Sequence, residues 1–584
     1  MSPFREVMEL EEKYLVLRSY MHSREMDFKV SFKHEDLEQL WFCTRRNVKR
    51  VLNQLEADGY FRYIPGRGRG NYSVLLFNQS FKEEIEAYIK KYVELGNLDM
   101  VAFILRLPIP RSWLIQLSSA SEFQKLFGFK RHSISKDILY TFKSREVSTL
   151  DPVDVSIALE VHLTQQLGDT LVCYDSERNR IIPHLAHHFI VDQSELIYTF
   201  YLRKDVHFHN MDKLSSLDVA FTVERLKTKS KAYAWLVESI KKVECETPYK
   251  VSIHLKKRNS LFLQMLSTAT FCILPSNTPF NEQEWIGTGP FLLKERSKSK
   301  IILQAFEHYF KERALIDEVH FYTVSKDAAN LLYLQSNPEK SKTKIEEQTL
   351  QDLCVVFLLF NQNRNTILKN SLLRTAIYHL MDLPKMIKDL QLNVCEASSF
   401  SDMRSKHLEK NQKLISTLLI KANYAGEEMK LGYLDNELTA VEAKWIIEEA
   451  GNVGINLKLM PISHTDFYDQ TIMNEVDLLF MKMIFSIDRH LSFMSIFRNE
   501  HLSIMQFLQT ETVEFIKQQL NAFEGAHNFN DREQIIIETE RILRDEKHLV
   551  FLYHPTITRT IDPIIQNATH HSYGHVDFRK LWLP

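Results

Sequence analysis

The sequence predicts a multidomain α/β protein that begins with a helix-turn-helix and a β-hairpin, continues through a helical connector and ends in a large α/β body. Three observations predict this organisation. The chain has 584 residues, which is too many for one hydrophobic core. Two short amphipathic helical patterns precede two β-rich runs that flank a glycine-rich stretch. From about residue 134 to the end, strand patterns alternate with helical patterns.

Composition limits the classes of function. The chain is 44% hydrophobic and 25% charged with a net charge of −2, so any binding of nucleic acid must come from a local patch. The N-terminus shows no apolar signal-peptide core, and the longest apolar runs, 354–360 and 478–485, fit buried strands and are too short to span a membrane. We therefore expect a cytoplasmic protein without membrane insertion. The six cysteines are scattered without a CxxC pair, which predicts buried thiols instead of disulfides or a zinc site.

The first 60 residues show three helical patterns. Residues 4–21 form the first, 32–41 the second and 44–60 the third. Thr44 is a suitable N-cap for the third helix, and Gly59 is a suitable stop signal. The short turn between the second and third helices completes a helix-turn-helix, and the β-rich runs that follow it form a hairpin.

The third helix has two chemically different faces. At 100° per residue, one stripe is apolar and contains Val48, Val51, Leu52 and Leu55. The opposite face and its flank carry the residues that we expect to bind DNA, which are Thr44, Arg45, Arg46, Lys49, Arg50 and Asn53. Arg and Lys bind guanine edges or phosphates, and Asn reads adenine. The alternative is an ordinary solvated basic face.

The stretch IPGRGRGNY, residues 64–72, joins the two β-rich runs and has three possible roles. A nucleotide-binding glycine loop requires a following helix or a GK[ST] ending, and neither is present. A disordered arginine-glycine tail would not lie between apolar β-rich runs. The remaining role is the tip of a wing, where glycines permit a tight turn and Arg67 and Arg69 reach DNA phosphates or the minor groove. A plain surface turn is the alternative.

Two resemblances to known families follow from these motifs. The segment LWFCTRRNVKRVLNQLEADGYFRYIPGRGRGNYSVLLF resembles the N-terminal winged-helix domain of the SgrR family of bacterial transcriptional regulators. LDP at 150–152, YTFYLRKDVHFHN at 198–210, LSSLDVAFTVERL at 214–226, GTGPF at 287–291 and the segment 360–382 resemble family-five solute-binding proteins of the peptide- and nickel-receptor type. The order of the two parts is that of the SgrR family.

The resemblance implies a division of the chain. Residues 1–78 would form the winged-helix domain and 79–133 the helical connector. The body would be a two-lobed α/β fold like the type II periplasmic binding proteins. Its lobe I would take 134–355 and 531–584, and its lobe II 356–530.

The resemblance also implies ligand-binding residues in the cleft between the lobes. In lobe II the acidic candidate is Asp488, with Arg489 beside it, and this pair suits a sugar phosphate or another polar metabolite better than a free peptide amine. A surface ion pair in a loop is the alternative. The other expected ligand-binding residues are Asp151, Tyr433, His464 and Thr465.

The sequence gives little support for a metal site or for catalysis. His184, His187 and His188 are close in sequence, and His207 and His209 share a face of a strand, so a metal site is conceivable. His209, however, matches an ordinary histidine of the family pattern, and we expect no metal or cofactor. No nucleophile elbow, HExxH or kinase signature occurs, so we do not expect an enzyme.

Three functional hypotheses remain. The first is a cytoplasmic regulator that binds double-stranded operator or promoter DNA and senses a small molecule, such as a peptide, a sugar phosphate or a similar metabolite, in its cleft. It would control a transporter operon and contact RNA polymerase. The second is the substrate-binding receptor of an ABC importer with an N-terminal docking domain. The third is a body that has lost its ligand and serves as a platform for protein interactions.

Overall fold

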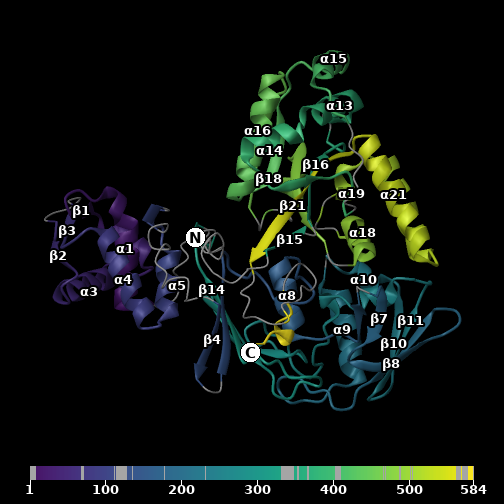
Figure 1. The fold of residues 1–584 in the computed structure, drawn as a ribbon, viewed down its shortest axis with the longest axis horizontal. Helices are drawn as coiled ribbons and strands as arrows, with labels where there is room; N and C mark the ends of the chain where they lie inside the picture. Colours follow the sequence, from purple (N-terminus) through teal and green to yellow (C-terminus); the bar gives the residue numbers. More distant parts are fainter. Residues whose placement is uncertain are drawn as a thin grey trace.

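The structure is a computed structural model of the chain with three parts, an N-terminal domain and the lower and upper lobes of the body (Figure 1). It describes residues 8–66, 72–110, 112–113, 128–133, 136–175, 178–230, 232–325, 327–329, 347–351, 354–364, 367–401, 409–463, 466, 469–485, 488–499, 502, 504–560, 567 and 576–582.

The N-terminal domain contains the expected helix-turn-helix and hairpin. Its elements are α1 (Leu10–Met21), β1 (Lys29–Phe32), α2 (His34–Leu40), α3 (Arg45–Ala57), β2 (Phe61–Ile64) and β3 (Ser73–Phe77). The strands form an antiparallel sheet in the order β1-β3-β2. The sequence did not predict β1, because its four residues KVSF are too few for a clear alternation. The hairpin β2–β3 and the added strand give the fold of a winged helix.

Two further helices belong to the core of the N-terminal domain. They are α4 (Phe81–Glu94), which starts with a capping box between Ser80 and Glu83, and α5 (Leu98–Arg106). Of the nine residues of α5, six are buried, namely Leu98, Val101, Ala102, Phe103, Ile104 and Leu105. A helix that is apolar nearly all round must be covered on more than one side.

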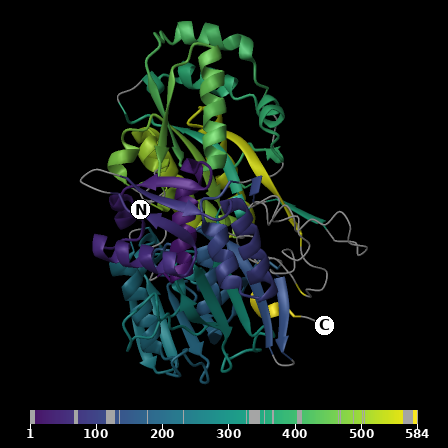
Figure 2. The same cartoon turned by 90° about the vertical axis from the view of Figure 1, so that its left-hand side faces the viewer.

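The cover on the second side of α5 is the lower lobe. The core around α5 includes Ile138, Tyr140 and Tyr322 of that lobe. The amide of Ser325 donates a hydrogen bond to the carbonyl of Leu105 over 2.8 Å, and Lys300 pairs with Asp99 at 3.0 Å. In Figure 2 the N-terminal helices lie directly in front of the strands of the lower lobe. The N-terminal domain is thus packed onto this lobe through α5.

The lower lobe contains two sheets and a hairpin. A four-stranded sheet has the order β10-β11-β9-β8, a five-stranded sheet has the order β12-β13-β14-β5-β4, and β6 pairs with β7. The strands are β4 (Gly128–Ser133), β5 (Lys136–Lys143), β6 (Val172–Asp175), β7 (Arg180–Pro183), β8 (Ala186–Val191), β9 (Ile197–Leu202), β10 (Ile240–Thr247), β11 (Lys250–Leu255), β12 (Phe291–Arg296), β13 (Lys300–Ala305) and β14 (Glu318–Thr323). The helices are α8 (Ala158–Leu167), α9 (Ser216–Lys229), α10 (Trp235–Glu238) and α11 (Phe262–Met265). The strand β4 lies in the region expected to be helical connector, because it pairs with β5 at the sheet edge.

The upper lobe is built on one mixed sheet with the order β15-β21-β16-β20-β18-β19, and β17 also pairs with β21. The strands are β15 (Glu347–Gln351), β16 (Cys354–Phe360), β17 (Val394–Glu396), β18 (Met429–Leu434), β19 (Leu457–Ile462), β20 (Leu478–Ile484) and β21 (Leu549–Thr560). The helices are α13 (Ser371–Leu380), α14 (Leu383–Leu390), α15 (Ile415–Lys421), α16 (Glu437–Asn452), α17 (Gln470–Met473), α18 (Arg489–Arg498), α19 (Ile504–Phe507), α20 (Thr510–Gly525) and α21 (Phe529–Asp545). The two long apolar runs of the sequence are its central strands β16 and β20, as predicted.

The chain returns from the upper to the lower lobe closer to its C-terminus than expected. The sequence assigned 531–584 to lobe I, but β21 pairs with β16 in the upper sheet. Only the last described segment returns to the lower lobe, where Phe578 and Leu581 pack with Phe291 and Phe321. The apolar run LVFLY of β21 fits the fully buried centre of the upper sheet, which explains its position.

The two lobes touch along one side. The backbone amide of Ser260 in the lower lobe donates to the carbonyl of Glu524 in α20 over 3.0 Å, and Lys257 pairs with the same glutamate at 2.8 Å. A guanidinium nitrogen of Arg532 in α21 donates to the Ser260 hydroxyl over 3.2 Å. These contacts join α20 and α21 to the lower lobe.

The packing of α5 can be tested by a cavity mutation. We expect Ile104→Ala, at a fully buried position, to lower the free energy of unfolding by about 2–5 kcal/mol and to speed proteolytic release of the N-terminal domain. Urea titration and limited proteolysis of the full chain measure both effects. Leu95→Ala, at a 68% exposed leucine next to α5, is the control and should change stability by less than about 0.5 kcal/mol. Equal behaviour of the two variants would contradict the anchoring role of α5.

Candidate functional site

The helix α3 has the two faces that the sequence predicts. Val48, Val51, Leu52 and Leu55 are buried in the core of the N-terminal domain. The six residues expected to meet DNA, Thr44, Arg45, Arg46, Lys49, Arg50 and Asn53, are all exposed. Contact of these residues with DNA stays a prediction. Arg67 and Arg69 lie outside the described residues.

The basic side chains of α3 are weakly engaged within the protein. Arg45 lies 3.6 Å from Glu35 in an ion pair whose two side chains are more than half exposed, so the pair contributes little. Arg50 donates to the side-chain oxygen of Asn47 over 3.2 Å. Within the described part of the chain, Arg46 and Lys49 form no ion pair. Thr44 occupies the N-cap position, but its side chain makes no capping bond. Most of this positive charge is therefore available to an external anion.

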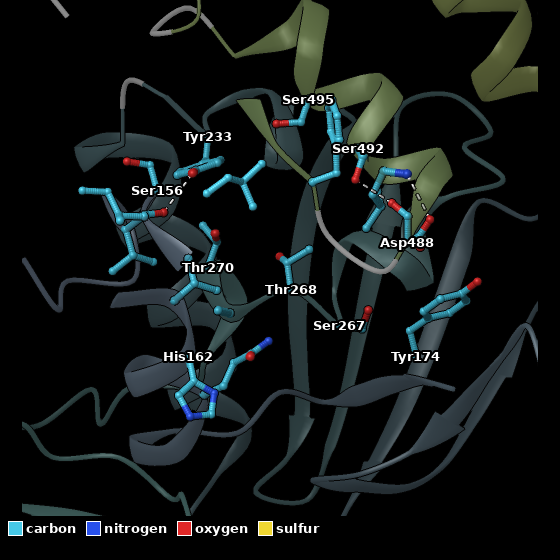
Figure 3. A pocket seen from close by; sticks show the side chains of 18 of the residues that line it. Ser156, His162, Tyr174, Tyr233, Ser267, Thr268, Thr270, Asp488, Ser492 and Ser495 are labelled. Atoms are coloured by element: carbon cyan, nitrogen blue, oxygen red, sulfur yellow. Dashed lines mark hydrogen bonds between the residues drawn. The ribbon is translucent and has the colours of Figure 1, made fainter. Parts of the chain in front are cut away.

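A large cavity lies between the two lobes of the body. Its volume is about 960 Å³, enough for a ligand of several residues or rings. The lower lobe contributes the segments 155–157 and 267–270, Tyr233 and the end of β6. The upper lobe contributes β20, the first turns of α16 and the inner face of α18. Figure 3 shows Tyr233, Thr268 and Thr270 of the lower lobe facing Ser492 and Ser495 of the upper lobe across this space.

A buried polar cluster forms the floor of the cavity in the lower lobe. The carboxylate of Asp169 lies 2.7 Å from Nε2 of His184 and accepts bonds from the hydroxyls of Tyr309 and Thr288, both at 3.2 Å. Burial disfavours the charged imidazole, but the pull of Asp169 outweighs this cost and raises the pKa of His184 to about 9. Lys311 Nζ lies 2.6 Å from His184 Nδ1, and burial lowers the pKa of Lys311.

The GTGP segment lies beside this floor. A Cβ at Gly289 would come within 2.4 Å of the backbone of Leu167, so only glycine allows the close approach of the two chains. His209 lies with Nε2 at 3.1 Å from the carbonyl of Gly289, and burial lowers its pKa to about 4. The imidazole of His209 is thus part of the packing of this turn. Among the described residues, no group of three or more His, Cys, Asp or Glu side chains is placed to hold a metal ion.

The structure separates the expected pair Asp488 and Arg489. Asp488 lines the cavity and caps α18, where its Oδ1 accepts from the amides of His490 and Leu491, both at 3.0 Å. Burial raises the pKa of this carboxyl. Arg489 points away and pairs with Glu533 of α21 at 2.8 Å. The expectation of a mixed pair in the cleft is wrong, and so is the alternative of a surface pair, because capping the helix buries Asp488 and turns its neighbour outward.

Two other expected ligand residues do not reach the cavity. Asp151 accepts two bonds from the guanidinium of Arg225, at 2.6 and 2.5 Å, so it is used for structure. Tyr433 is only 5% exposed and packs in the core of the upper lobe. His464 and Thr465 lie outside the described residues.

Most of the cavity lining was not found from the sequence. Tyr233, Thr268 and Ser492 come from distant segments, and none carries a motif. In the upper lobe Glu442 also lines the cavity, where it accepts a hydrogen bond from the Tyr553 hydroxyl and burial raises its pKa. These residues gather only when the lobes pack against each other, so no local sequence pattern marks them.

Across the described residues, no helix combines the length and apolar character required to cross a bilayer.

The floor cluster makes a prediction about pH. Because the pKa of His184 rises from 6.5 to about 9 on folding, its stabilising effect is complete below pH 6.5 and is lost as the pH rises through about 9. We expect the free energy of unfolding to fall by 1–3 kcal/mol, to order of magnitude, over this interval. Urea titrations at several pH values measure this slope. In Asp169→Asn the slope should disappear, and in Asp175→Asn, whose carboxylate pairs with arginines, it should remain. A slope in Asp169→Asn equal to that of the wild type would refute this assignment.

Comparison with known proteins places both parts of the chain. Residues 180–501 match the model of the bacterial extracellular solute-binding proteins, family 5, and residues 9–121 match the N-terminal model of the sugar transport-related sRNA regulator. The uncharacterised protein YhjP of Bacillus subtilis is 26% identical over 548 residues, which are 93% of this chain and 94% of YhjP. The HTH-type transcriptional regulator SgrR of Yersinia enterocolitica is 28% identical over 59% of this chain and 61% of its own length.

Solved structures support the fold of the body. The periplasmic binding protein DppA of Helicobacter pylori, in complex with the peptide STSA, covers 76% of this chain and 98% of its own with a TM-score of 0.65 and 20% identity. NikA of Brucella suis, in complex with Fe(III)-EDTA, gives a TM-score of 0.65 at 18% identity over 76% of this chain and all of its own. The chain belongs to family 5 of the bacterial extracellular solute-binding proteins, and it carries in front of that body the N-terminal domain of the SgrR-type regulators.

Proposed function

We propose that the protein is a transcriptional regulator that binds double-stranded DNA through its winged-helix domain. The observation that carries this proposal is the exposed basic face of α3, whose apolar face is buried in a helix-turn-helix with a hairpin behind it. Such a helix enters the major groove, while its cations neutralise phosphates. The similarity to SgrR of Yersinia enterocolitica, an HTH-type transcriptional regulator, supports it.

The receptor-like body gives this regulator a sensor. A cavity of about 960 Å³ lined by both lobes suits a small ligand whose binding favours the closed arrangement of the lobes. On this proposal the protein acts in the cytoplasm, where DNA and metabolite are both present. Control of a transporter operon and contact with RNA polymerase are further parts of the proposal. The alternative of an importer receptor explains the body but gives no role to the basic face of α3.

Salt-dependent DNA binding tests the assignment of α3. With the full chain and a duplex from the promoter region of its own gene, we expect Arg46→Ala to weaken binding about tenfold and to reduce the slope of log K against log salt by roughly one. Fluorescence anisotropy at several salt concentrations measures both quantities, and a random duplex of the same length reports the phosphate contribution alone.

Lys90→Ala is the matched control for this experiment. It removes one positive charge from an exposed position on α4, a different helix of the same domain. We expect its affinity and salt slope to equal those of the wild type. If Arg46→Ala and Lys90→Ala behave alike, α3 is not the DNA-binding element.

A further inference from the structure

The strand β1 presents one face of the winged-helix sheet to solvent. Its residues alternate, so that Val30 and Phe32 are buried in the core of the N-terminal domain while Lys29 and Ser31 are exposed. Lys33, which follows the strand with an extended backbone, is exposed as well. In Figure 1 the strands β1, β3 and β2 lie on the side of the N-terminal domain that is remote from the body. This face of the sheet is therefore accessible to an external partner.

Lys33 lies beside Tyr72 at the loop end of the hairpin β2–β3. Phe32 pairs with Ser73 in the antiparallel register of β1 and β3, so the residue after Phe32 lies opposite the residue before Ser73. The Nζ atom of Lys33 is 5.4 Å from the centre of the Tyr72 ring, and Tyr72 is 56% exposed. Because a cation at this distance is attracted to an aromatic face, the ammonium group and the phenol are held side by side.

The first turn of α2, which follows Lys33, lies beside the basic face of α3. Arg45 of α3 is 3.6 Å from Glu35 of this turn. Burial lowers the pKa of His34 in the same turn, and the positive charges of Arg45 and Lys49 lower it further. Both observations place the start of α2 next to the side chains of α3 that we expect to bind DNA. The exposed cations of α3 therefore continue across the start of α2 to Lys33.

The polar groups of Lys33 and Tyr72 are available to a ligand. Among the residues that the structure describes, neither the ammonium group of Lys33 nor the hydroxyl of Tyr72 has a hydrogen-bond or ion-pair partner. The ammonium group carries a positive charge and three donors, and the phenol adds a fourth donor. A group that carries a negative charge and several acceptor oxygens matches this pair, and a DNA phosphate has both properties.

We propose that Lys33 and Tyr72 together bind a backbone phosphate of the DNA duplex that α3 holds. The ammonium group neutralises the phosphate charge, and the Tyr72 hydroxyl donates a hydrogen bond to a phosphate oxygen. This inference rests on the proposed DNA binding and adds two residues to it. A phosphate contact carries no direct sequence information, so the pair fixes the orientation of the duplex relative to α3 and does not select bases.

Fluorescence anisotropy with the full chain, a duplex from the promoter region of its own gene and a random duplex of equal length tests this contact. We expect Lys33→Ala to weaken binding about fivefold on both duplexes and to reduce the slope of log K against log salt by roughly one. Tyr72→Phe should also weaken binding about fivefold, but with an unchanged slope, because it removes a hydrogen bond and no charge. The backbone amide of Lys33, which donates to Asp36 over 3.2 Å, is kept in the alanine variant.

The same domain contains a matched control pair, Arg24 and Tyr20. The guanidinium of Arg24 lies 4.9 Å from the centre of the Tyr20 ring, and Tyr20 is 43% exposed. This pair comes before β1 in the chain, whereas Lys33 follows the last residue of that strand. We expect Arg24→Ala and Tyr20→Phe to bind both duplexes like the wild type. Thermal unfolding without DNA shows that each of the four variants folds.

Equal affinity and equal salt slope of Lys33→Ala and Arg24→Ala would overturn the proposal. A loss that is confined to the promoter duplex would also overturn it, because a contact that depends on sequence is a base contact. If Arg46→Ala weakens binding while Lys33→Ala and Tyr72→Phe do not, the phosphate contact is removed and the DNA-binding role of α3 remains. If the wild type binds neither duplex, the proposed function itself fails.

Discussion

The burial of α5 between the winged helix and the lower lobe is the contact that holds the N-terminal domain in a fixed position on the body. Its apolar residues contribute to a core that contains α1, α3 and α4 on one side and strands β5 and β14 on the other. Apolar burial on two sides is worth far more than the exposed ion pairs at this junction, since each fully buried large apolar side chain contributes about 1.5–3 kcal/mol. The domain that carries α3 is consequently oriented by the lower lobe and not by a flexible linker.

The N-terminal domain could be predicted closely from its sequence because its signals are local. The faces of α3 follow from residues three and four apart, and the hairpin follows from glycines between two β-rich runs. The apolar runs of β16 and β20 were likewise recognisable as buried strands. The strand β4 was missed because its pairing with β5 decides its structure, and β21 was assigned to the wrong lobe because strand order is set by tertiary packing.

The cleft shows the limit of local reasoning more clearly. Asp488 was identified by its position after β20 and does line the cavity, but Arg489 next to it lies on another face of α18 and contacts α21. Asp151 was chosen because it belongs to the LDP motif, but its carboxylate accepts a hydrogen bond from Arg225. A chemical type at a sequence position indicates what a residue can do, whereas the partner that it meets after folding decides what it does.

The one-sided attachment of the winged helix has a mechanical consequence. The described core around α5 contains residues of the lower lobe. The position of α3 is therefore fixed relative to that lobe. If the protein works as proposed, closure of the upper lobe over a ligand leaves the position of α3 on the DNA unchanged and moves only the upper lobe. The quantity that ligand binding sets is then the position of the upper lobe relative to the DNA axis. A neighbouring protein on the same promoter would sense the ligand as the presence or absence of an obstacle.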